Sequence, residues 1–243
     1  NREGYLASAI KNPEVKMTFS RAGKEVEVKL HTVTYAQVKN WLYNEWEDTN
    51  RALVDRLGDG QIAYTHMRDM GSEELNEFLK DMHTRTLGKK AIIIDLRYNN
   101  GGNVHNEVLE FLSQKAHYQW AYRDFPSNSH PNVTPGDIPI IALVNERSLS
   151  DAEVTSNGIQ TLGLATIVGT ETYRWIIFTS GTTLLDGSYL RLPAWGCYSL
   201  DGKDLESTGV KPDIYVKNTF EDRLKGRDPQ LERAIEEALK RIK

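Results

Sequence analysis

A serine and a pair of glycines each follow a strongly apolar run of the chain, and together they suit acyl-transfer chemistry. The pairs are Ser150-Asp151 and Gly101-Gly102. Backbone N–H groups at the start of a helix, or in a glycine-rich turn, point outward and can bind a developing oxyanion. Ser150 is therefore a candidate nucleophile, and the N–H groups of Asp151 and of Gly101 or Gly102 are candidate oxyanion donors.

Both motifs also have ordinary structural explanations. Ser150-x-x-Glu153 has the pattern of a capping box, in which two side chains only satisfy free N–H groups at a helix start. A tight turn uses Gly-Gly equally well. The occurrence of both motifs, each after its own apolar run, favours a shared site over two unrelated turns.

A third candidate group is the carboxylate of Glu206. It lies just before Gly209 and a predicted strand. A carboxylate in this place could orient a catalytic histidine, as the acid of a triad does. A solvated surface glutamate would look the same in the sequence.

Composition excludes several classes of protein. The chain has 243 residues, 39% apolar and 26% charged, which is typical of a globular domain. A net charge of −4 indicates neither a nucleic-acid surface nor a polybasic membrane patch. No apolar run approaches the ~20 residues of a membrane span, and one cysteine, Cys197, excludes an internal disulfide. The chain starts with Asn and has no signal peptide, so we expect it to be a piece of a longer protein. Its sequence does not determine the compartment, although we favour a cytoplasmic location over a periplasmic one.

Hydrophobic periodicity predicts an α/β fold. Residues 15–30 alternate around a glycine turn and predict a hairpin, and 34–57 predict a helix. Strands are then expected at 62–67, 91–96, 138–144 and 165–168, alternating with helices from 72, at 104–113 and up to 162. Residues 184–200 are β-rich, 228–242 form a capped amphipathic helix, and 123–137 are expected to be a surface loop.

These motifs, in this order, resemble the tail-specific and tricorn proteases, a family of serine peptidases with a ClpP/crotonase-like α/β core, a central β-sheet flanked by helices. The motifs that carry the resemblance lie at residues 60–64, 69–71, 95–102, 145–153, 169–172, 186–188 and 209–214. The ending at 226–236 resembles the tricorn branch specifically. The resemblance implies that residues 1–31 are the end of a PDZ-like domain and that 32–243 are the catalytic core.

The resemblance also implies roles for single residues. Ser150 matches the nucleophile, Asp151 and Gly101 or Gly102 match the oxyanion donors, and Glu206 matches the acid partner of the histidine. In the tricorn branch that histidine precedes the PDZ domain, so it is expected outside this chain. The family needs no metal or organic cofactor, acts on peptides, and forms oligomers, so we expect peptide substrates and a homo-oligomer.

The wider family also contains a Ser–Lys dyad, and this sequence departs from it. Trp175 stands at the position of the lysine and cannot accept a proton. Tricorn-like chains usually have glycines here, so the bulky Arg174 and Trp175 would reshape the substrate site. Of the six histidines, His66 lies in an apolar strand pattern and is expected to be a hydrogen-bonded core residue, and four others have no supporting context. That leaves His105, three residues after Gly102, as the candidate replacement base.

Two other functions stay open at this point. One is a catalytically inactive core that binds peptides or scaffolds an assembly, with Ser150 serving as a cap. The other is an acyl-CoA enzyme of crotonase type, which would use a glycine-rich oxyanion hole but not Ser150.

Overall fold

In the computed structural model, residues 13–133 and 135–242 are described. The expectations for residues 1–12, 134 and 243, including the first part of the predicted PDZ-like segment, lie outside them. The chain forms two compact units, residues 1–49 and 50–243.

The first unit contains the predicted hairpin. Strands β1 (Glu14–Arg21) and β2 (Lys24–His31) pair antiparallel, with Arg21 opposite Lys24. The two turn residues between them, Ala22 and Gly23, both have positive φ, as a tight two-residue hairpin turn requires. Helix α2 (Tyr35–Leu57) begins in this unit, and its last turns belong to the second.

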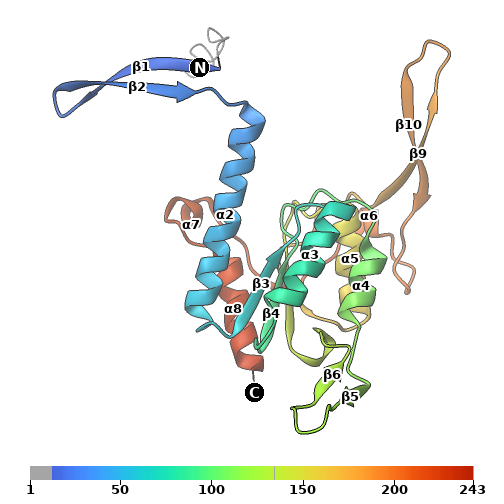
Figure 1. The fold of residues 1–243 in the computed structure, drawn as a ribbon. Helices are drawn as coiled ribbons and strands as arrows, with labels where there is room; N and C mark the ends of the chain where they lie inside the picture. The colour runs from blue at the N-terminus through green and yellow to red at the C-terminus, as the bar shows by residue number, and fades with distance from the viewer. Residues whose placement is uncertain (1–12, 134, 243) are drawn as a thin grey trace. The chain divides into compact units, whose positions relative to one another are not determined.

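The second unit is built on a five-stranded parallel sheet (Figure 1). Its strand order is β11-β8-β7-β4-β3. The bounds are β3 (Ile62–His66), β4 (Ala91–Asp95), β7 (Ile140–Val144), β8 (Thr166–Gly169) and β11 (Ile214–Tyr215). Strands β3, β4 and β7 are buried along their whole length, because both faces of a parallel sheet are covered.

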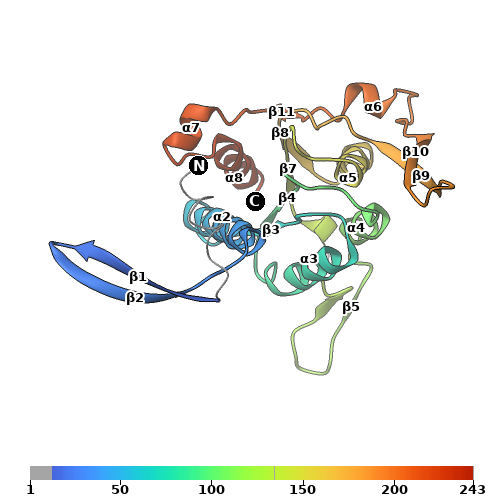
Figure 2. The same cartoon turned by 90° about the horizontal axis from the view of Figure 1, so that it is seen from above.

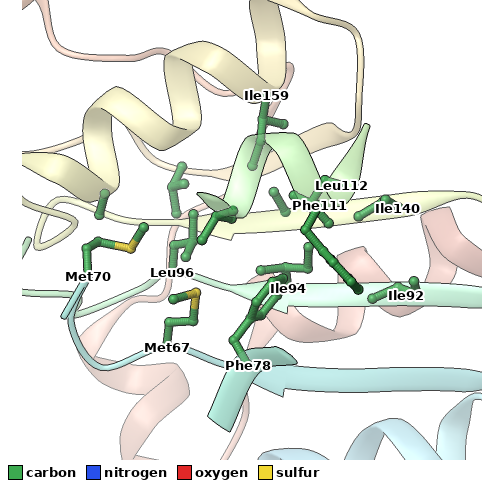
Figure 3. Packing of buried hydrophobic residues seen from close by; sticks show 14 of the residues in the cluster. Met67, Met70, Phe78, Ile92, Ile94, Leu96, Phe111, Leu112, Ile140 and Ile159 are labelled. Carbon is green, nitrogen blue, oxygen red and sulfur yellow. The ribbon is translucent and has the colours of Figure 1, made fainter. Parts of the chain in front are cut away.

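Helices cover both faces of this sheet (Figure 2). One face carries α3 (Ser72–Thr84), α4 (His105–Leu112) and α5 (Asp151–Thr161), and its core includes Phe78, Ile94 and Leu112 (Figure 3). The other face carries α8 (Pro229–Arg241). The α/β class with a central sheet flanked by helices is thus confirmed.

Helix α8 forms where the sequence predicts it. The Asp228 side chain accepts a hydrogen bond from the Leu231 N–H at 3.0 Å, and Pro229 occupies the first turn, where its missing N–H costs nothing. Leu231 and Ile235 then face the sheet, fully or almost fully buried.

Several smaller elements differ from the prediction. The expected loop at 123–137 contains a strand and a 3₁₀ turn, and the hairpin after β8 starts before residue 184. The remaining elements are β5 (Tyr118–Trp120), β6 (Asn128–His130), η1 (Pro135–Asp137), β9 (Ile177–Thr183), β10 (Tyr189–Gly196), α6 (Leu205–Thr208) and α7 (Phe220–Leu224). These segments are short or exposed, so apolar periodicity marks them weakly. None of the helices in the described ranges is long and apolar enough to cross a membrane.

The sheet also sets where a site can lie. Strands β4 and β7 are parallel neighbours, with Asp95 opposite Leu143. Their carboxyl ends therefore open at the same edge, and the Gly101-Gly102 turn and the Ser150 turn both leave from it.

Candidate active site

A buried ion network fixes the chain as it leaves β4. Arg97 is 1% exposed, and its guanidinium contacts Asp95 at 2.7 Å and Asp228 at 2.8 Å. Burial alone would raise the pKa of the Asp95 carboxyl, but the charge and hydrogen bonds of Arg97 outweigh burial and hold this pKa below its ordinary value. The network joins the end of β4 to the cap of α8.

Asn99 connects three segments around the turn that follows. Its side-chain amide donates to the Met67 carbonyl at 2.8 Å, and its side-chain oxygen accepts the Gly101 N–H at 2.8 Å. Its backbone carbonyl accepts the Leu149 N–H at 2.9 Å, one residue before Ser150. Asn99 is fully buried, and the sequence alone did not reveal its role.

The two glycines lie in tight contact with neighbouring backbone. A Cβ atom on Gly101, whose φ is +78°, would lie 2.7 Å from the Ser150 Cβ and 3.2 Å from the Asp151 nitrogen. A Cβ atom on Gly102 would lie 2.1 Å from the Met70 carbonyl oxygen. Only glycine fits at either position, and Gly101 lies directly against the Ser150 turn.

The hydrogen bonds distinguish the two glycines as possible oxyanion donors. The Gly101 N–H is occupied by Asn99. Met70 bonds to the groups on either side of Gly102, the Gly101 carbonyl and the Asn103 N–H, each at 2.9 Å. The Gly102 N–H therefore points away from Met70, and it has no acceptor among the described residues.

Ser150 occupies a strained strand-to-helix turn. It precedes α5, is partly buried, and has φ 50° and ψ −114°. An ordinary N-cap residue has extended backbone, and a positive φ at a residue other than glycine costs about 1–3 kcal/mol. The Glu153 half of the predicted capping box is present, since its carboxylate accepts the Ser150 N–H at 2.9 Å, but capping alone does not require this strain.

Glu153 connects the Ser150 turn to the segment 172–175. Its carboxylate is fully buried and accepts four hydrogen bonds. The donors are the Ser150 N–H (2.9 Å), the Thr172 hydroxyl (2.6 Å), the Arg174 N–H (2.8 Å) and the Trp175 N–H (2.9 Å). The segment 172–175, which carries the bulky residues noted in the sequence, is thus tied to the same carboxylate as Ser150.

The Asp151 N–H and side chain face different surroundings. Its N–H has no acceptor in the part of the chain that the structure describes. Its side chain is 1% exposed and accepts bonds from the Val104 N–H (2.8 Å), the His105 N–H (3.1 Å) and the His105 Nδ1 (2.5 Å). Asp151 therefore braces the start of α4 while its own N–H stays available.

Glu206 belongs to a different segment, α6, from this cluster. It is exposed in α6, and within residues 13–133 and 135–242 its side chain makes no hydrogen bond or ion pair. The segment that carries it is anchored through Thr172, which exchanges backbone and side-chain hydrogen bonds with Val210. The chain thus fixes the backbone near Glu206 but gives its carboxylate no partner among the described residues.

His66 and Cys197 are two further side chains whose types could take part in chemistry. His66 is 6% exposed and its Nδ1 lies 2.8 Å from the Asp95 carbonyl, so it is the core histidine that the sequence predicts. No histidine in the described ranges is hydrogen-bonded to Ser150. Burial, together with the charges of Asp204 and Glu153, raises the pKa of the Cys197 thiol, which disfavours the reactive thiolate.

Two further features concern ligands. Among the residues with described positions, no group of three or more His, Cys, Asp or Glu side chains could hold a metal ion. A cavity of about 530 Å³ lies between the far end of α5, the loop 199–203 and α6. Neither Ser150 nor Gly102 lines it, so it is separate from the cluster around the serine.

Comparisons with known proteins agree with the resemblance seen in the sequence. The model of peptidase family S41 matches residues 60–216. The tricorn protease of Thermoplasma acidophilum is 31% identical over 204 residues, covering 83% of this chain and 19% of that protein. Tricorn protease homolog 1 of Streptomyces coelicolor is 29% identical over 242 residues, covering 97% of this chain and 22% of that protein.

A solved structure of the tricorn protease has the same fold. Its TM-score is 0.84 at 26% identity, over 98% of this chain and 23% of that one. The chain thus spans about a fifth of the length of the tricorn proteins it matches. With the family model covering more than half of its residues, the chain belongs to peptidase family S41 and is a relative of the tricorn proteases.

Proposed function

We propose that the parent protein is a serine peptidase that cleaves peptides through an acyl-enzyme on Ser150. One observation carries this proposal. The strained Ser150 turn lies against Gly101-Gly102, and the N–H groups of Gly102 and Asp151 have no acceptor among the described residues. Free N–H groups beside a strained serine suit the stabilisation of an oxyanion.

In this mechanism the Ser150 hydroxyl attacks the scissile carbonyl. The Gly102 and Asp151 N–H groups bind the oxyanion of the tetrahedral intermediate, each contributing about 3 kcal/mol. A base takes the Ser150 proton and passes it to the leaving amine, and water then hydrolyses the acyl-enzyme.

The base in this proposal is a histidine from a part of the protein outside this chain, oriented by Glu206. Two observations support it. Ser150 has no histidine partner within the described residues, and Glu206 offers an exposed, unengaged carboxylate.

We also propose that the parent self-associates, since β9 and β10 expose apolar side chains such as Leu190, Leu192 and Trp195. Sedimentation of the parent at increasing concentration tests this second point.

The test of the peptidase proposal is hydrolysis of a mixed peptide library by the parent, followed by mass spectrometry. We expect Ser150→Ala to lower kcat/KM more than about a thousandfold. Ser156→Ala, at a buried serine of α5, serves as the control for serine removal and keeps the activity. A parent that cleaves no peptide would favour the inactive, peptide-binding alternative, and binding of acyl-CoA would favour the crotonase-type one.

A further inference from the structure

The two proposed oxyanion donors sit on separate segments that must be held at a fixed spacing. Gly102 lies just before α4, and Asp151 is the first residue of α5. A donor displaced by about 1 Å can cost a hundredfold in rate. Something must therefore brace the start of α4 against the start of α5.

The Asp151 carboxylate makes this brace. All three of its hydrogen bonds go to the start of α4, and His105 supplies two of them. The backbone bonds would survive any substitution that keeps the helix. The imidazole bond, at 2.5 Å, depends on the histidine side chain, and hydrogen bonds to a carboxylate are stronger than neutral ones.

We propose that His105 is a positioning residue for the oxyanion hole. Its Nδ1–H donates to the Asp151 carboxylate and so sets the Asp151 N–H relative to the Gly102 N–H. This role uses His105 as a hydrogen-bond donor and involves no proton transfer to or from Ser150. The inference rests on the proposed function, because an oxyanion hole has a purpose only if Ser150 is a nucleophile.

The competing role for His105 is that of a general base replacing the upstream histidine. The two roles make different demands on the side chain. A positioning residue needs an N–H group near the place of Nδ1, whereas a base needs an atom that can accept and release a proton. Asparagine supplies the first and not the second.

The experiment compares His105→Asn, which keeps a donor, with His105→Leu, which removes it, in the parent protein. We measure kcat, KM and the rate of fluorophosphonate labelling at Ser150. His105→Leu is expected to lower kcat and the labelling rate about 10- to 100-fold with little change in KM, because the lost stabilisation acts on the transition state. His105→Asn is expected to stay within about threefold of the wild type.

Controls separate this inference from folding and from the proposed function. His31→Asn, at an exposed histidine of β2 in the first unit, should change nothing. Urea unfolding of each variant identifies misfolding, and His105→Phe, which keeps a ring without a donor, replaces His105→Leu if the latter is unfolded. Loss of activity in His105→Asn equal to that in the donor-free variant would overturn the inference, and so would full activity in the donor-free variant. An unlabelled wild-type parent would instead overturn the proposed function.

Discussion

The region around Ser150 and the region around Glu206 are constructed differently. The first, residues 95–102, 145–153 and 172–175, is closed by buried side chains, with Asn99 and Glu153 accepting or donating several hydrogen bonds each. In the second, residues 204–210, the backbone is anchored at Thr172 and the Glu206 side chain is exposed. The chain therefore preorganises Ser150 and the proposed oxyanion donors, and it presents the Glu206 carboxylate toward solvent or toward another part of the protein.

The largest loss of stability is expected from removing the Glu153 carboxylate. Glu153→Leu leaves three backbone N–H groups and a hydroxyl without their acceptor, and each unsatisfied buried group costs about 1–3 kcal/mol. We expect the free energy of unfolding to fall by about 4 kcal/mol, measured by urea denaturation, and Ser150 labelling to be lost. A loss below about 1 kcal/mol would show that the Ser150 region is not preorganised by this carboxylate.

The next largest loss of stability is expected from replacing Arg97. Arg97→Met leaves the buried Asp95 without its cation, which costs about 3 kcal/mol at neutral pH. In the wild type the lowered pKa of Asp95 contributes stability that is fully present above about pH 4, the ordinary aspartate pKa, and is lost as the pH falls through the folded-state pKa. In the variant, protonation of Asp95 relieves the unpaired charge.

The stability difference between the wild type and Arg97→Met should therefore shrink as the pH is lowered from 7 toward 3. Urea denaturation at a series of pH values measures it. A difference that stays constant with pH would contradict the assigned role of the Asp95–Arg97 pair.

A smaller change in stability, a gain and not a loss, is expected from replacing Ser150. If the serine is held in a strained turn for catalysis, Ser150→Gly relieves the strain and raises the free energy of unfolding by about 1 kcal/mol. Thr219, the cap of α7, has an ordinary φ of −81° and serves as the control, since Thr219→Gly removes a cap without relieving strain and should lower stability slightly. Destabilisation by Ser150→Gly would support the view that the serine is only a cap.

The smallest effect on stability is expected at Glu206. Glu206→Leu repeats the substitution made at Glu153, but at an exposed side chain without partners among the described residues, so the free energy of unfolding should change by less than about 0.5 kcal/mol. The parent should still lose activity, by about a hundredfold or more, if Glu206 orients the histidine. A clear loss of stability together with unchanged activity would assign Glu206 a structural role.

The sequence predicts the strands that position the site better than it predicts the hydrogen bonds within it. Apolar runs at 91–96 and 138–144 locate β4 and β7, and with them the edge from which both turns leave. The choice between Gly101 and Gly102 could not be made, because it depends on the Asn99 side chain and on Met70 from another segment. Glu153 could be foreseen as a cap, but its bonds to 172–175 arise only from tertiary packing.

The measurement that tests the account most directly is labelling of this chain and of its longer parent with a fluorophosphonate probe, located by mass spectrometry, with Ser150→Ala as the control. We predict labelling at Ser150 in the parent and none in the isolated chain, because in the proposed mechanism the chain supplies the nucleophile and the oxyanion donors while the base comes from elsewhere. Equal labelling of both would contradict a base outside this chain. No labelling of either would contradict the role of Ser150 as a nucleophile.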